Sequence, residues 1–245
     1  MLRTAESDLV GEIGVLIGRQ ILGHCNACHA ARNALGAASD TLDLAGGLIP
    51  VQNWYAPSLT SASEAGMADW DVPSIVELLR SGISGQAMVS GPMSEVVMGS
   101  TQYLTPADLT AMAIYLKSLP QTANTPVPRP VGSDATAAGA GAKLYTRHCQ
   151  DCHGPSGEGV PHAYPALARS RTVNMPTPAN LIHIVKEGGF APATRDNPRP
   201  FGMPPFATIL SDGEIAQVLT WIRQQWENSA PPVTPLDVKE FSGPS

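Results

Sequence analysis

The sequence predicts an all-α fold made of two tandem helical domains joined by an extended linker. The first observation is an internal repeat: residues 75–82 align with residues 181–188 at an offset of 106 (181 minus 75), and residues 115–116 align with 221–222 at the same offset. The second is an amphipathic helical pattern at the end of each half, and the third is the lack of any clear strand pattern. The chain is therefore expected to contain two copies of the same helical unit.

Four segments are expected along the chain. An N-terminal domain covers residues 8–120, and a C-terminal domain covers residues 138–228. Between them, residues 121–137 are rich in Pro, Thr and Ala without periodic apolar positions, which predicts the extended linker. Residues 229–245 are also rich in Pro and predict an extended tail that lies over the surface.

Each domain is expected to end in an amphipathic helix. Thr105 and Ser211 are suitable N-caps for these helices, and an acidic residue follows three positions later in both, as in a capping box. Apolar residues recur at helical spacing in the two helices: Leu109, Met112, Ala113 and Leu116, and then Ile215, Val218, Leu219 and Ile222.

Composition narrows the range of functions. The formal net charge is −6, from 15 basic and 21 acidic side chains, so nucleic acid is not an expected partner. Aromatic residues make up 5% of the chain, and Gly and Pro number 23 each. Neither half therefore has an obvious large apolar core, and a buried cofactor would supply the missing apolar volume.

All four cysteines belong to two copies of the motif Cys-x-x-Cys-His, at residues 25–29 and 149–153. This run is the attachment site of c-type haem. Two thiols on one face of a helical turn can bond to the haem vinyl groups, and the adjacent histidine becomes the proximal iron ligand. A thioredoxin-like pair needs no histidine, and a zinc site would require both motifs to converge on one metal. We therefore expect two covalently bound haem c groups, held by Cys25, Cys28 and His29 and by Cys149, Cys152 and His153.

The sixth iron ligand separates electron transfer from ligand binding or catalysis. In the C-terminal domain, Met203 lies in a proline-rich loop just before the last helix and is the expected ligand. In the N-terminal domain, Met88, Met93 and Met98 all lie in the corresponding loop. Counting along the repeat favours Met98, but a helix over residues 94–98 would rise only ~1.5 Å per residue, which favours Met93. Four histidines outside the motifs are weaker candidates: His24, His148, His162 and His183.

Several segments resemble the multihaem cytochrome c subunits of membrane-bound dehydrogenases, which serve quinoprotein alcohol dehydrogenases and flavin-dependent gluconate dehydrogenases among others. Residues 89–97, with the sequence VSGPMSEVV, and residues 115–120 are similar to the second haem domain of these subunits, and residues 203–206 and 230–233 are similar to the third. The resemblance covers nearly the whole chain and implies two class I cytochrome c-type domains. In that family the methionine of Gly-Pro-Met is the expected ligand, which supports Met93. Such subunits usually also carry a first haem domain and a C-terminal membrane-binding segment, so the chain is expected to be a dihaem relative or a piece of a trihaem subunit.

Four further residues are expected to contact the haems. Arg32, Trp54 and Tyr55 are candidates for hydrogen bonds to haem propionates, with ordinary packing as the alternative for each. Pro165 resembles the proline of class I cytochromes whose carbonyl orients the proximal histidine, a contact that tunes the potential of the iron.

These observations predict a dihaem cytochrome c in which His29 and Met93, and His153 and Met203, ligate the two irons. The chain is expected to be an electron-transfer protein or dehydrogenase subunit, not an enzyme, and to pass single electrons from a periplasmic dehydrogenase to a quinone, a cytochrome or a terminal oxidase. Two alternatives stay open: a dihaem redox enzyme of the peroxidase or thiosulfate-oxidising type, and a haem-based ligand sensor. Haem c is attached outside the cytoplasm, so export to the periplasm is expected although the sequence does not start with a signal-peptide layout. Any membrane association is expected to come from a segment or subunit outside this chain.

Overall fold

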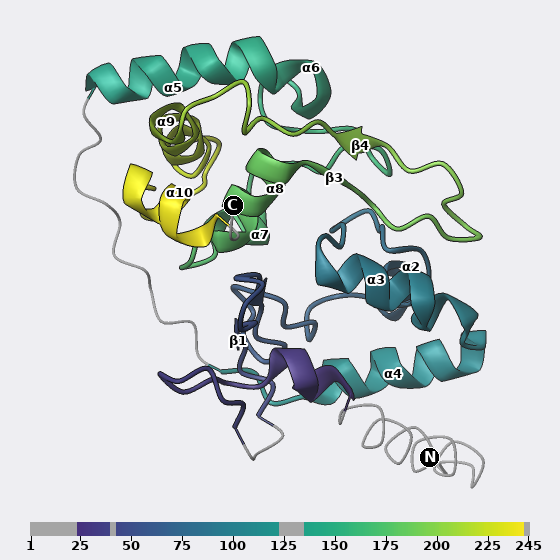
Figure 1. Ribbon diagram of the computed structural model, residues 1–245. Helices are drawn as coiled ribbons and strands as arrows, with labels where there is room; N and C mark the ends of the chain where they lie inside the picture. Colours follow the sequence, from purple (N-terminus) through teal and green to yellow (C-terminus); the bar gives the residue numbers. More distant parts are fainter. Residues whose placement is uncertain (1–23, 40–42, 123–134, 243–245) are drawn as a thin grey trace, which may run out of the picture.

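The structure is a computed structural model that describes residues 24–39, 43–122 and 135–242, the side chains of residues 135–138 excepted. Most of the expected linker and the start of the expected N-terminal domain lie outside these residues, so the domain boundaries stay predictions. The described helices form two groups, one for each half of the chain, and the groups lie against each other (Figure 1). The fold is mostly helical, as the sequence predicts.

The N-terminal domain is built around two helices that pack together, α2 (Val72–Ser81) and α4 (Pro106–Ser118). A helical stretch at residues 24–29 precedes them, and α3 (Pro92–Gly99) and the 3-10 turn Thr101–Tyr103 lie between them. The Asp71 carboxylate caps α2, and Thr105 and Asp108 form the expected capping box at the start of α4. The core is made of apolar side chains from both helices and the loop before them, including Leu44, Ile75, Leu79, Leu109, Met112 and Leu116.

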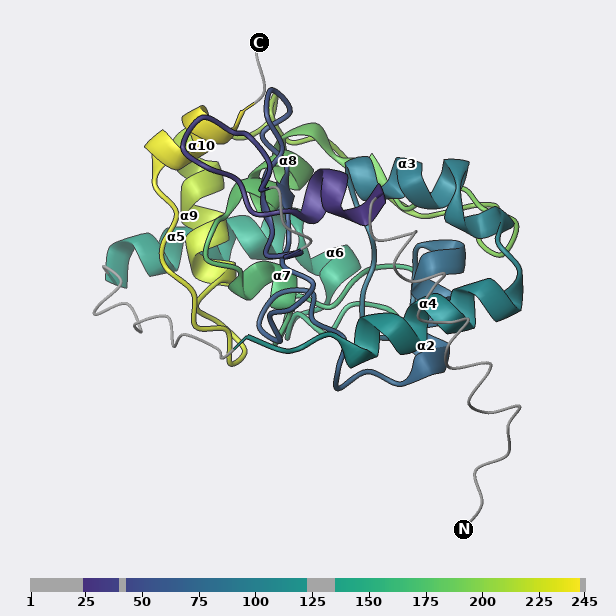
Figure 2. The ribbon, with the colours of Figure 1, turned by 90° about the horizontal axis from the view of Figure 1, so that it is seen from below.

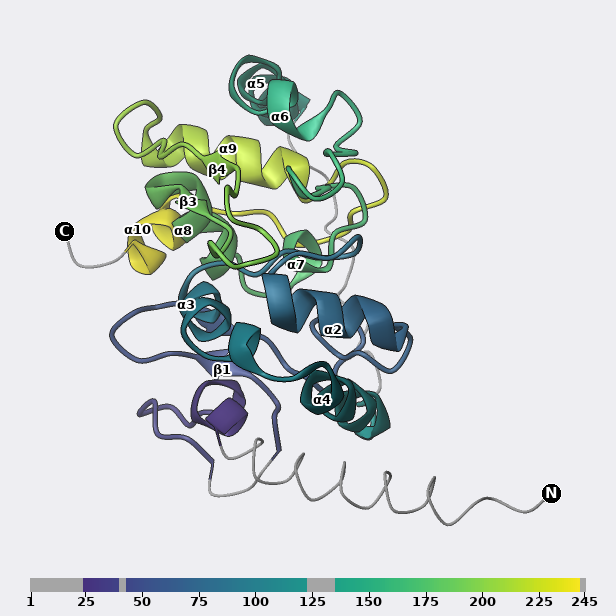
Figure 3. The ribbon, with the colours of Figure 1, turned by 90° about the vertical axis from the view of Figure 1, so that its right-hand side faces the viewer.

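The C-terminal domain repeats this arrangement. Its helices are α5 (Ala135–His148), α6 (Gln150–His153), α7 (Arg171–Asn174), α8 (Ala179–Glu187), α9 (Asp212–Ile222) and α10 (Pro235–Phe241). α4 and α9 start at Pro106 and Asp212, which are 106 positions apart (212 minus 106), so the repeat in the sequence is a repeat of structure. α5 crosses α9 on the side away from the N-terminal domain, whereas α7 and α8 face that domain (Figure 3).

Two features differ from the sequence-based expectation. Four two-residue strands form two small antiparallel pairs, β1 (Gly47–Leu48) with β2 (Tyr55–Ala56) and β3 (Gly189–Phe190) with β4 (Gly202–Met203). Strands of two residues are too short to leave an alternating pattern in the sequence.

The expected extended tail is the second difference, because part of it is helical. Thr234 caps α10 in a capping box with Asp237, and Pro235 follows the cap at a position where proline favours helix. Val238 is fully buried, because α10 packs on α8 and α9 (Figure 2). The tail therefore completes the core of the C-terminal domain. No helix in the part of the chain that the structure describes is long and apolar enough to cross a membrane.

Side chains from α7 and α8 join the two domains. Arg171 donates two hydrogen bonds to the Asp69 carboxylate, at 3.0 and 2.7 Å, and one to the Gly66 carbonyl at 2.7 Å. The Asn180 side chain accepts from the Tyr55 backbone N–H and donates to the Tyr55 carbonyl, both at 2.8 Å. Paired hydrogen bonds of this kind fix geometry as well as adding free energy, so they favour one docked orientation.

A second contact region between the domains lies at the end of α2. Arg80 and Asp196 form an ion pair at 2.6 Å, and the Thr194 hydroxyl donates to the Ser81 carbonyl at 3.3 Å. Gly82 ends α2 with a left-handed φ of 82°, and a Cβ atom at this position would clash with the ring of Pro192. This second region is therefore made of specific polar contacts and one close approach of backbone to proline.

Candidate haem sites

Both cysteine motifs lie on short helical turns. Residues 24–29 are helical in the first motif, and Cys149 is the N-cap of α6 in the second. The backbone N–H groups of Cys152 and His153 both donate to the Cys149 carbonyl, at 3.2 and 2.9 Å, which winds this motif into one turn. All four cysteines are free and partly buried. Each pair of thiols is therefore available on a helical turn, as attachment to two vinyl groups requires.

Each histidine of the two motifs is oriented by a proline carbonyl. His29 Nδ1 donates to the Pro57 carbonyl at 2.7 Å, and His153 Nδ1 donates to the Pro165 carbonyl at 2.9 Å. A carbonyl can only accept, so the ring proton lies on Nδ1 and the lone pair of Nε2 is free to bind iron. Burial lowers the pKa of both histidines, with the proline bond opposing it, and favours the neutral ring that a metal needs.

Sequence reasoning missed Pro57, although a signal was present. Pro57-Ser58-Leu59 and Pro165-Ala166-Leu167 share the pattern Pro-x-Leu, and each follows a histidine of the motif at some distance. The distances differ, because 28 positions separate His29 from Pro57 and 12 separate His153 from Pro165. The longer N-terminal loop, which contains β1 and β2, hides the equivalence in the sequence.

The surroundings of the thiols suit an apolar macrocycle. Cys25 packs against the N-terminal core, and Cys149 packs against an apolar cluster around Tyr145 and Val173. Burial raises the pKa of Cys25, and it raises the pKa of Cys149 to about 11. Thiols in apolar walls, beside a histidine with a free Nε2, fit haem c. Among the residues that the structure describes, no group of three or more His, Cys, Asp or Glu could hold a separate metal ion, so the zinc alternative gains no support.

The candidate methionines differ in burial. Met93 is partly buried in the first turn of α3 and packs against the N-terminal core, whereas Met98 at the far end of α3 is 46% exposed. Met203 lies in β4 opposite Gly189 and packs against the C-terminal core. Burial therefore separates Met93 from Met98 and agrees with the preference for Met93 that the expected helix over residues 94–98 gave.

The three candidates for propionate binding have partners within the protein. The two terminal guanidinium nitrogens of Arg32 donate to the carbonyls of Gly36 and Ala27, at 3.2 and 2.6 Å. The Tyr55 hydroxyl donates to the Glu64 carboxylate at 3.0 Å, and burial together with this carboxylate raises the pKa of Tyr55. The Trp54 ring stacks on a histidine of the other domain. Their roles toward haem propionates stay predictions.

Two of the four other histidines lie at the contact between the domains, whereas His24 is exposed and the His148 ring packs against Phe206 within the C-terminal domain. His162 is exposed and lies 3.8 Å from the Glu77 carboxylate, across the interface. His183 on α8 is 2% exposed and contacts Trp54 and Glu187. Sequence reasoning placed His183 on a short helix but gave no sign of its role between the domains.

Two helical domains, each with a pair of thiols on a turn and a carbonyl-oriented histidine, define a protein that carries two covalently attached haems. The chain matches the Cytochrome c family over residues 15–120 and 138–226. It belongs to the cytochrome c family, and its two cysteine pairs bind two haem c groups.

Several relatives are cytochrome subunits of dehydrogenases. The chain is 39% identical over 225 residues to the cytochrome c subunit of the alcohol dehydrogenase (quinone) of Gluconobacter oxydans strain 621H, a match that covers 85% of this chain and 46% of that protein. The corresponding subunit of Komagataeibacter europaeus is 38% identical over 239 residues, covering 89% and 50%. The gluconate 2-dehydrogenase cytochrome c subunit of Pantoea cypripedii is 33% identical over 226 residues, covering 85% and 51%. The chain spans about half the length of these curated relatives.

Proposed function

We propose that this chain is a dihaem cytochrome that accepts single electrons from a periplasmic dehydrogenase and passes them to a quinone, a second cytochrome or a terminal oxidase. The observation that carries the proposal is repeated in both domains: a histidine that is at least partly buried with its proton held on Nδ1, and a partly buried methionine packed on the domain core. The relatives named as dehydrogenase cytochrome subunits support a dehydrogenase as the donor.

Met93 and Met203 are the proposed sixth ligands. Haem c, once bound, supplies a one-electron couple. His29 and His153 would hold the iron through Nε2, and a thioether opposite histidine raises the reduction potential. The proline carbonyls of residues 57 and 165 keep each ring in one tautomer and orientation, so that little rearrangement accompanies a change of charge at the site.

The alternative functions, a redox enzyme or a ligand sensor, require a haem iron with a different sixth position. A peroxidase or a ligand sensor needs an open or displaceable sixth position, and thiosulfate-oxidising cytochromes use a cysteine ligand. All four cysteines of the chain belong to the two attachment motifs. A partly buried methionine packed on the core of each domain supports closed, six-coordinate haems.

Absorption spectroscopy on the protein with both haems tests the ligands. The ferric form should show the weak red band of methionine-ligated haem c at both sites, and the reduced form should not bind CO. Met93→Ala should remove the band of the first haem and lower its potential, whereas the matched variant Met98→Ala should change neither. CO binding at both reduced haems would contradict simple electron transfer, and loss of the band only with Met98→Ala would show that Met93 is not the ligand.

A further inference from the structure

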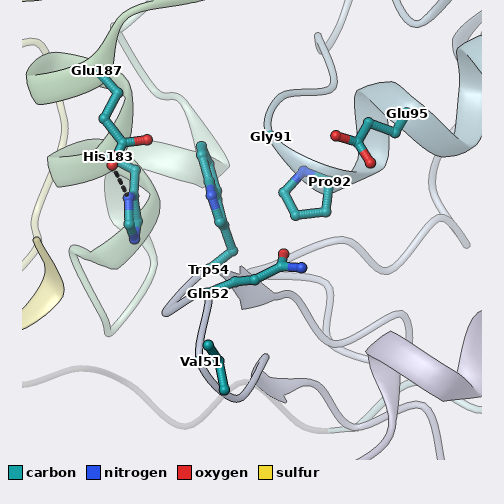
Figure 4. Close-up of a pocket in the computed structure, with 8 residues that line it drawn as sticks. All are labelled: Val51, Gln52, Trp54, Gly91, Pro92, Glu95, His183 and Glu187. Atoms are coloured by element: carbon teal, nitrogen blue, oxygen red, sulfur yellow. Dashed lines mark hydrogen bonds and ion pairs between the residues drawn. The ribbon is translucent and has the colours of Figure 1, made fainter. Parts of the chain in front are cut away.

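Trp54 lies between the two domains and touches both. Its indole stacks on the imidazole of His183 in α8, with ring centroids 4.7 Å apart and planes inclined by 14°. On its other side is the Gly91-Pro92 turn that begins α3 (Figure 4). A Cβ atom on Gly91 would lie 2.7 Å from three carbons of the indole, so the backbone approaches the ring as closely as glycine permits.

His183 is held firmly in this stack. Its side chain is 2% exposed, and Nδ1 donates to the Glu187 carboxylate one turn further along α8, at 3.0 Å. Its Nε2 is buried and has no hydrogen-bond partner. The imidazole is therefore held by its own helix and by the Trp54 ring that stacks on it.

Each side of the stack is connected to a proposed sixth ligand through a short stretch of backbone. On the N-terminal side, Pro92 directly precedes Met93. On the C-terminal side, α8 runs from His183 to its C-cap Gly188, and the next residue, Gly189, pairs with Met203 in the β3–β4 register. The Trp54 and His183 rings therefore connect the Gly91-Pro92 turn, which precedes Met93, with α8, which leads to the strand paired with Met203.

A pocket lies beside the stack. Its volume is about 380 Å³, and its walls include Trp54, Pro92, Glu95, His183 and Glu187 (Figure 4). Electron tunnelling decays faster across an open gap than through atoms in van der Waals contact. The two stacked rings supply such contact across the domain boundary.

We propose that the Trp54–His183 stack couples the two haem domains electronically, and that both residues are positioning residues for electron transfer between the haems. The inference rests on the proposed function, because it takes Met93 and Met203 as ligands. A single electron leaves the ferrous haem of one domain and reduces the ferric haem of the other. No bond forms or breaks, no proton moves, and neither ring is itself oxidised.

The test is the rate of electron transfer between the haems in the half-reduced protein, followed after a light pulse or by pulse radiolysis. Trp54→Leu keeps an apolar side chain but removes the ring, and should slow the transfer at least severalfold with both potentials unchanged. Trp54→Phe restores a ring and should recover most of the rate. Arg80→Gln is the matched control, because it removes an ion pair of the same interface away from the stack.

Two outcomes would overturn the proposal. One is a rate for Trp54→Leu equal to that of the unmodified protein. The other is an equal slowing of Trp54→Leu and Arg80→Gln together with an increased radius of gyration in X-ray scattering, which would assign Trp54 to docking alone. The red absorption band keeps this test separate from the proposed function: its absence from the unmodified protein would refute the ligands, whereas an unchanged rate with the band intact refutes only the role of the stack.

Discussion

At the scale of single residues, Arg171 brings together three different interactions. Its Nη2 donates to both oxygens of the Asp69 carboxylate, and its Nη1 donates to the Gly66 carbonyl. The guanidinium carbon lies 5.9 Å from the centre of the Trp70 ring. A planar guanidinium can satisfy a carboxylate, a carbonyl and an aromatic face at once, which lysine cannot do. Arg171 belongs to the C-terminal domain and all three partners to the N-terminal domain, so one side chain links the two.

We predict that Arg171→Gln raises the pKa of Asp69. The hydrogen bond from Arg171 is the main reason that this pKa lies below its ordinary value. With the folded-state pKa below an unfolded value of about 3.9, the contribution of the bridge is present above about pH 4 and is lost as the pH falls through the folded-state pKa.

Carboxyl NMR of the reduced, diamagnetic protein measures this pKa in both forms. The Asp69 side chain is 64% exposed, so the effect on overall stability is expected to be small even though the pKa moves. Asp71, whose low pKa comes mainly from hydrogen bonds with Ser74, is the internal control and should titrate as before. An unchanged pKa of Asp69 would show that the bridge does not form in solution.

At the scale of elements, the crossing of α5 and α9 depends on one small residue. Gly141 in α5 lies against α9 so closely that a Cβ atom would be 2.6 Å from the Gln217 carbonyl oxygen and 2.6 Å from Trp221 Cβ. Two residues earlier, Gly139 of the same helix has nothing within 4 Å of such an atom. The same helix therefore contains one glycine needed for packing and one that is not.

These two glycines form a matched pair for mutation. Gly139→Ala should raise the free energy of unfolding by about 0.5–1 kcal/mol, because alanine favours helix. Gly141→Ala also increases the helix propensity of α5, but its Cβ atom forces α5 and α9 apart. This variant should therefore lower the free energy of unfolding by about 1–3 kcal/mol. Denaturant unfolding followed by circular dichroism gives both values. Equal effects of the two variants would mean that α5 and α9 do not cross as described.

The sequence predicted elements where their signals are local. The amphipathic helices and the capping boxes at Thr105 and Ser211 follow from spacing within one or two turns, and all are present. The short strand pairs were not predicted, because a strand of two residues is too short to show an alternating apolar pattern. The helix α10 was not predicted, because the prolines around it indicated an extended tail. Thr234 and Asp237 nevertheless form a capping-box pattern that is visible in the sequence.

At the scale of the whole molecule, the contacts between the domains could not be predicted from the sequence. Arg171 and Asp69 are 102 positions apart, and Tyr55 and Asn180 are 125 apart, so no local spacing relates them. The haem motifs, by contrast, combine cysteine and histidine within five residues and were recognisable directly. The chemistry of each site was therefore predictable, but the way in which the two sites are brought together was not.

The acidic character of the whole chain leads to a prediction about its donor. With a formal net charge of −6, the cytochrome should dock to a basic or neutral face of a dehydrogenase. Reduced quinoprotein alcohol dehydrogenase or gluconate dehydrogenase should reduce the ferric protein, at a rate that falls as salt is added. Stopped-flow absorption measures this rate, with an acidic protein that contains no haem as the control for ionic strength. Failure of every such dehydrogenase to reduce it would contradict the proposed donor.

The close contact between Gly82 and Pro192 limits which N-terminal and C-terminal haem domains can be combined in one cytochrome. A residue with a Cβ atom at position 82 would clash with a proline that belongs to the other domain, and the φ of 82° would add backbone strain. An N-terminal domain borrowed from a cytochrome that lacks this glycine would not fit the same C-terminal surface. The two haem domains are thus a matched pair, and recombination, whether in evolution or in the laboratory, has to transfer both sides of their contact together.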